Sequence, residues 1–145
     1  MSKGNKKNTY KAAKVEKGSA RAQVSKKQYI DLYYMIDSVL SVKEIAGSLL
    51  EEKPELDEKM ECWEEAGVLE IITGEESSID MEMLELSKDE MEDEFLVTHK
   101  VVCVYSVHTD TTQLQHVKEL FGILVGKRGG MLCSDTADFQ PILVK

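Results

Sequence analysis

The chain has 145 residues, of which 42% are hydrophobic, so it can bury one small core but not the walls of a large substrate cleft. No uncharged apolar run approaches the about 20 residues of a membrane helix, and the N-terminus lacks the apolar centre of a secretory signal. The 3 Cys residues are widely spaced, which favours reduced thiols over a disulfide framework. We therefore expect an intracellular protein, cytoplasmic or nuclear.

The charge of the chain is divided between a basic N-terminus and an acidic remainder. Residues 1–28 carry nine basic side chains against Glu16 alone, a formal charge of +8, although the whole chain has a net charge of −9. Because large apolar residues are scarce there, burial cannot offset the entropy of ordering, and we predict a disordered arm over 1–27. The arm could be a solubilising tail, fold onto an acidic surface, or bind nucleic acid weakly and without sequence preference. The candidate phosphate contacts are Lys3, Lys6, Lys7, Lys11, Lys14, Lys17, Arg21, Lys26 and Lys27.

The residues after the arm predict three helices, over 27–40, 42–52 and 54–66. In the first, Tyr29, Tyr33 and Ile36 recur at helical steps. The second opens with the capping box Ser-x-x-Glu at 41–44. The third begins at a proline that blocks continuation of the second and ends at a glycine that tolerates a left-handed backbone. Within it, the register predicts that Trp63 is a core anchor.

A hairpin is predicted next, from about 68 to 86. A β-prone segment, 68–73, is followed by the turn Gly-Glu-Glu-Ser-Ser at 74–78. In the second strand Ile79, Met81 and Met83 alternate with Asp80 and Glu82, as in a strand with one buried face.

Three helices and a hairpin, with apolar residues at this spacing, resemble the winged helix-turn-helix superfamily over residues 28–86. The matching positions, counted from Ala46, are Leu49, Leu56, Met60, Trp63, Gly67, Val68 and Leu69, with Pro54 and Gly74 where that superfamily often has a proline and a wing turn. The resemblance implies an α+β fold, with a three-helix core and a β-hairpin wing. The alternative is another small helical bundle with a hairpin.

The chain departs from DNA-binding members of that superfamily in its third helix, the one that should contact bases. The exposed positions expected there are mostly acidic, and a duplex would be repelled by them. Winged helices also dock to proteins, and an acidic face suits a partner with a basic surface. The candidate partner contacts are Tyr34, which we expect to be the exposed member of the Tyr33–Tyr34 pair, and Glu55, Glu58, Glu61 and Glu65.

Residues 87–94 predict an acidic linker or a short capped helix, and residues 95–145 predict a strand, a helix and short strands. The strand lies in a β-branched run that ends at Thr109-Asp110, and the helix covers Leu114 to Leu124. This small α/β region either forms a separate lobe or extends the sheet of the wing, and the pattern does not choose between them.

No motif in the chain predicts catalysis, a cofactor or a metal site. The segment from Gly122 to Arg128 has the wrong glycine spacing for a phosphate loop and reads as a helix end. The Cys and His residues lack zinc-site spacing, and Cys103 or Cys133 with His108 has no nucleophile signature.

We therefore expect a non-catalytic winged-helix protein that docks to a macromolecular partner. A nucleic-acid-associated assembly, such as the transcription machinery or its regulators, fits the resemblance and the basic arm. The first alternative is an acidic inhibitor or immunity-type protein that binds a basic enzyme surface, with charge steering the encounter. A small enzyme built on the C-terminal region is the second alternative.

Overall fold

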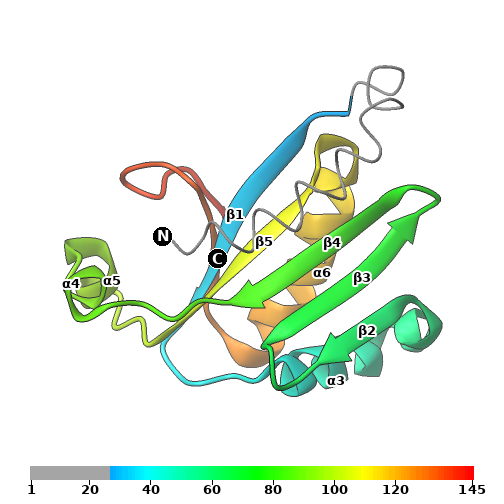
Figure 1. Cartoon of the computed structure of the whole chain (residues 1–145), viewed down its shortest axis with the longest axis horizontal. Helices are drawn as coiled ribbons and strands as arrows, with labels where there is room; N and C mark the ends of the chain where they lie inside the picture. The colour runs from blue at the N-terminus through cyan, green and yellow to red at the C-terminus, as the bar shows by residue number, and fades with distance from the viewer. Residues whose placement is uncertain (1–26) are drawn as a thin grey trace.

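The computed structural model describes residues 27–145, and its main element is one antiparallel sheet of seven strands. In chain order the strands are β1 (Tyr29–Ile36), β2 (Met60–Trp63), β3 (Val68–Gly74), β4 (Ser77–Met83), β5 (Cys103–Asp110), β6 (Met131–Ser134) and β7 (Ile142–Val144). The α-helices are α3 (Val42–Glu52), α4 (Lys88–Met91), α5 (Glu94–Thr98) and α6 (Leu114–Arg128), and the 3-10 helices are η1 (Pro54–Lys59) and η2 (Thr111–Gln113). Their arrangement is drawn in Figure 1.

The strand order across the sheet is β2-β3-β4-β5-β1-β6-β7, so the two longest strands, β1 and β5, lie in its middle. Strand β1 pairs with β5 along its whole length, from Tyr29 opposite Asp110 to Ile36 opposite Cys103. Strand β5 also pairs with β4, which continues the β3–β4 hairpin. Strands β5, β6 and β7 therefore belong to the same sheet as the hairpin, so the C-terminal region extends that sheet.

The long helices α3 and α6 cover one face of this sheet, behind it in Figure 1. Ile45 and Leu49 of α3 and Phe121 and Leu124 of α6 are buried in one cluster with residues such as Leu69 of β3. The Ser41–Glu44 capping box begins α3, and ion pairs from Lys127 to Glu51 and Glu52 join the two helices at their surface. This cluster is the main core.

The described residues cover one end of the opposite face. There Leu96 of α5 and Phe139 of the loop before β7 pack over Met35, Val104 and Cys133 in a second, smaller cluster. Among residues 27–145, no helix covers the rest of that face, which is formed by β2, β3, β4, β5 and the first half of β1.

The expected α+β winged helix-turn-helix core is wrong, because residues 27–145 form a seven-stranded antiparallel sheet, and among them the long helices are α3 and α6. Residues 29–36 are a strand, since Ile30, Leu32 and Tyr34 alternate with Tyr29, Asp31 and Tyr33 and face the main core. The expected third helix is a 3-10 helix followed by β2, and Trp63 is 46% exposed rather than a core anchor.

The other expected elements are confirmed. The structure has a helix over Val42–Glu52, a hairpin within 68–86 and a helix that begins at Leu114. The region 87–94 contains a short helix capped by Ser87. Within residues 27–145, no helix is long and apolar enough to cross a membrane.

Candidate functional site

The open face is the part of the sheet that neither the long helices nor the second cluster covers, and it contains a groove of about 410 Å³. Because successive side chains of a strand point to opposite faces, the residues that alternate with the core residues line it. Two aromatic residues lie on strands at opposite sides of this groove. They are Trp63 on β2 and Tyr29 on β1, and Tyr29 is 51% exposed. The ring of Tyr29 stacks on His108 with centroids 5.2 Å apart. No Lys or Arg is among the described residues that line the groove.

A row of polar side chains crosses the open face from β2 to β1. The register places Glu61 opposite Glu70, Glu70 opposite Asp80, Asp80 opposite His108, and His108 opposite Asp31. We call these five residues the acidic row. A 2.8 Å contact joins His108 Nδ1 to Asp31 Oδ1, and Glu82, two residues after Asp80 in β4, lies on the same face. Four carboxylates therefore share one line across five strands.

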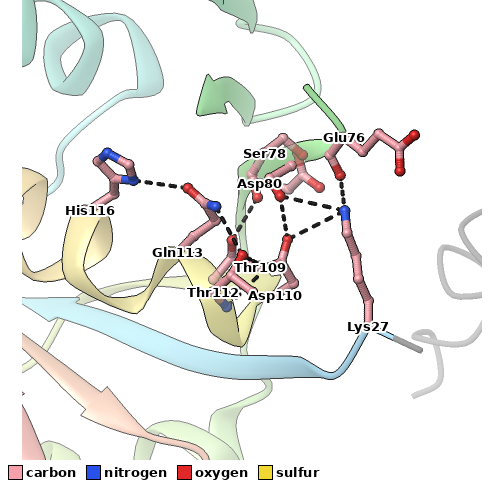
Figure 2. Close-up of polar contacts among 10 residues, drawn as sticks. Lys27, Glu76, Ser78, Asp80, Thr109, Asp110, Thr112, Gln113 and His116 are labelled. Carbon is pink, nitrogen blue, oxygen red and sulfur yellow. Dashed lines mark hydrogen bonds and ion pairs between the residues drawn. The ribbon is translucent and has the colours of Figure 1, made fainter. Parts of the chain in front are cut away.

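Asp110 lies at the end of the groove beside Tyr29 and pairs with Lys27, which precedes β1 in the chain (Figure 2). The Asp110 carboxylate accepts hydrogen bonds from Ser77 Oγ at 2.7 Å and from the Thr112 amide at 3.0 Å, and it lies 3.7 Å from Lys27 Nζ. Lys27 also donates to the backbone carbonyl of Glu76. Burial opposes ionisation of Asp110, but the hydrogen bonds from Thr112 and Ser77 and the charge of Lys27 outweigh it and lower its pKa. The ammonium group of Lys27 is therefore bound at the rim of the groove.

A second cavity, of about 440 Å³, lies where the second cluster covers the sheet. Its walls are apolar residues such as Leu84, Leu96 and Phe139, and its rim is formed by acidic residues of 89–93. Tyr33 lines it, and burial together with the nearby Asp135 raises the pKa of this tyrosine to about 12. This cavity contains no basic side chain among its described lining residues.

The structure separates the predicted partner contacts. Tyr34 is fully buried and donates a 2.6 Å hydrogen bond to the Gly129 carbonyl, so the expectation that it is exposed is wrong, and Tyr33 is the more exposed of the pair. Glu55 and Glu58 are exposed on η1, and Glu65 is exposed in the turn between β2 and β3. Of the predicted set, only Glu61 belongs to the acidic row.

Of the predicted phosphate contacts, Lys27 is described and the other eight lie outside the described residues. Lys27 is half-buried and bound to Asp110, Glu76 and Ser77 rather than extended into solvent.

The structure does not bring the Cys and His residues together. Cys103 is buried in the main core and Cys133 in the second cluster, on opposite faces of the sheet. Burial raises the pKa of Cys133 to about 11, so at neutral pH it is a thiol rather than a nucleophilic thiolate. Within residues 27–145, no three His, Cys, Asp or Glu residues are placed to hold a metal ion. The segment from Gly122 to Arg128 is the end of α6, as the sequence predicts.

No protein-family model matches the chain, and neither a curated protein nor a solved structure matches it.

Sequence reasoning missed most of this site. Asp80 and Glu82 were visible as the polar positions of an alternating strand, but their neighbours Glu70, His108 and Asp31 become neighbours only through strand pairing. The local signal that could have found Asp31 is its place between Ile30 and Leu32 in a segment rich in aromatic and β-branched residues.

Proposed function

We propose that the chain is a non-catalytic docking protein whose groove binds an extended, basic segment of a partner protein. The observation that carries this proposal is the acidic row on the open face. Glu70 lies opposite Asp80 in this row, and neither residue belongs to the core. Lys or Arg side chains of a partner would be attracted to these carboxylates.

The aromatic residues support the same ligand chemistry. An ammonium or guanidinium group is attracted both to carboxylates and to the face of an aromatic ring, most strongly to that of tryptophan. Trp63 is half-exposed in the groove, and Glu82 lies across the strands from it, since both residues face Val68 in the register. In an extended segment, alternate side chains point the same way, so every second residue could supply a Lys or Arg to the groove.

The role in a nucleic-acid-associated assembly was expected from the winged-helix fold together with the basic arm, and the sheet contradicts that fold. The acidic inhibitor alternative relies on the same charge. Its contacts would be the exposed carboxylates outside the groove, such as Glu55 and Glu58 on η1. The two proposals therefore place the binding energy on different residues.

Two charge-matched double variants of the full chain separate these surfaces. The first, Asp80→Asn with Glu82→Gln, removes two half-buried carboxylates of the groove. The second, Glu55→Gln with Glu58→Gln, removes two exposed ones from η1. The probe is a fluorescein-labelled peptide of alternating Lys and Thr, with blocked ends, and anisotropy measures its affinity at low ionic strength.

Both double variants are made in a full chain whose basic segment 1–26 is neutralised by Lys17→Gln, Arg21→Gln and Lys26→Gln, so that it does not compete with the probe. We expect the groove variant to bind the peptide about 5- to 30-fold more weakly than this parent chain, from about 0.5–1 kcal/mol for each charge pair. The η1 variant should bind nearly as the parent chain does. Equal affinity of the groove variant and the parent chain would refute the proposal, and a loss confined to the η1 variant would favour the inhibitor surface.

A further inference from the structure

We propose that the groove is occupied within the same chain by the basic segment 1–26, which a partner must displace. This inference rests on the proposed function, since it names a first occupant for the same docking surface. The structure describes the chain from Lys27 onward, and that residue lies at the rim of the groove. The segment that precedes it therefore enters the described fold beside Tyr29 and Asp110, both of which line the groove.

Charge complementarity favours this occupant. Residues 1–26 contain eight basic side chains against Glu16 alone, a formal charge of +7. The described residues that line the groove include Glu70, Glu76, Asp80 and Glu82 and no Lys or Arg. Lys27, the first described basic residue, already binds Asp110 and the Glu76 carbonyl at the rim (Figure 2).

The length of the segment is also sufficient. From β1 to β2 the sheet has four spacings between neighbouring strands, or about 19 Å at about 4.8 Å each. The registers also place Trp63 in the row of Tyr33, six residues or about 20 Å along β1 from Lys27, so the diagonal from Lys27 to Trp63 is about 28 Å. An extended chain covers that distance in about nine residues, which counted back from Lys27 end at Gly18, next to Lys17. The segment 1–26 is therefore long enough to reach Trp63.

Tethering makes this occupancy strong even if each contact is weak. A short flexible connection gives an effective concentration of about 1 mM, so an arm with an intrinsic dissociation constant of about 0.1 mM would fill the groove about ten times more often than it leaves it empty. A separate basic peptide would then bind the wild type about tenfold more weakly than it binds a chain whose arm cannot dock. Salt would release the arm, because the Debye length falls from about 30 Å at 0.01 M to about 3 Å at 1 M.

The single Trp of the chain lies in this groove and reports its occupancy. The measurement is acrylamide quenching of Trp63 fluorescence in three full-length proteins. They are the wild type, an arm variant with Lys17→Gln, Arg21→Gln and Lys26→Gln, and a charge-matched control with Lys43→Gln, Lys59→Gln and Lys118→Gln. The control residues are exposed and none of them lines the groove.

We expect quenching of the wild type and the control to be weak at low salt and to rise at least twofold as salt increases. The arm variant should be strongly quenched at all salt concentrations. Equal quenching of the arm variant and the wild type at low salt would overturn the inference. Protection of Trp63 that increases with protein concentration would overturn it too, since the arm would then reach a second copy.

The alternating Lys/Thr peptide, added to the arm variant, separates failure of this inference from failure of the proposed function. If the peptide protects Trp63 although the wild-type arm does not, the docking surface stands and the occupancy by residues 1–26 is wrong. If the peptide also leaves Trp63 unprotected, the proposed function fails with it.

Discussion

Replacing Asp110 with Asn should destabilise the fold by about 2 kcal/mol at neutral pH. Asp110 is 2% exposed, and its carboxylate accepts hydrogen bonds from Ser77 and Thr112. Asn keeps the shape but not the charge. Hydrogen bonds to a charged group contribute about 1.5–3 kcal/mol each, against about 0.5–1.5 kcal/mol for neutral pairs, so two such bonds lose about 1 kcal/mol each. Urea unfolding should show a lower midpoint at an unchanged slope.

The effect of Asp110→Asn should depend on pH in a defined direction. The pKa of Asp110 is lowered below its ordinary 3.8 in the folded protein, so its carboxylate stabilises the fold fully above that pH and less as pH falls toward the folded pKa. The difference in unfolding free energy between wild type and variant should therefore be full at neutral pH and shrink below pH 3.8.

A control and two outcomes complete this test. Lys27→Gln removes the 3.7 Å ion pair to Asp110 and the contacts of the ammonium group with the Glu76 carbonyl and Ser77, and it should cost about 1 kcal/mol, less than Asp110→Asn. An Asp110→Asn variant as stable as the wild type at neutral pH would refute the reasoning. So would a difference that stays constant below pH 3.8.

Two further substitutions test the packing of the sheet. Gly130→Ala should cost about 2–5 kcal/mol in chemical denaturation, because φ is 91° and a Cβ atom would lie 2.6 Å from the Met35 carbonyl oxygen. The matched change Gly126→Ala, in α6 with open space around it, should instead stabilise by about 0.4–1 kcal/mol, and a destabilised Gly126→Ala would contradict that comparison. Trp63→Ala should cost about 2 kcal/mol or less, because Trp63 is 46% exposed; a loss of about 3–5 kcal/mol would instead indicate a core anchor.

The sequence predicted those elements whose signals are local. Helix α3 carries its own capping box at Ser41 and Glu44, and α6 has apolar residues at helical spacing over more than two turns. The β3–β4 hairpin has a short turn and alternating residues in its second strand. Each of these patterns specifies a conformation without help from distant residues.

The misread elements have patterns that fit two periods. In β1 the apolar residues Tyr29, Tyr33 and Ile36 fit helical steps, yet Ile30, Leu32 and Tyr34 fit a strand equally well. Residues 29–36 form a strand because they pair with both β5 and β6, whose residues lie about 70 to 100 positions away in the sequence. Strand β2 is similar, since Met60–Trp63 is ordered by pairing with β3.

The candidate site was hidden for the same reason. Asp31, Glu61, Glu70, Asp80 and His108 are scattered along the sequence, and only the strand registers assemble them into one row. The charge division between residues 1–28 and the rest was readable from composition. The composition did not show on which surface of the fold the acidic side chains lie together.

The most direct test of the open face as a docking surface is amide NMR of the full chain during titration with the alternating Lys/Thr peptide. The indole N–H of Trp63 gives a single signal, because the chain contains one Trp. We predict that this signal and the amides of β3, β4 and β5 beside the acidic row shift with peptide concentration, while those of α6 do not. Shifts confined to η1 around Glu55 and Glu58, with Trp63 unchanged, would contradict the account.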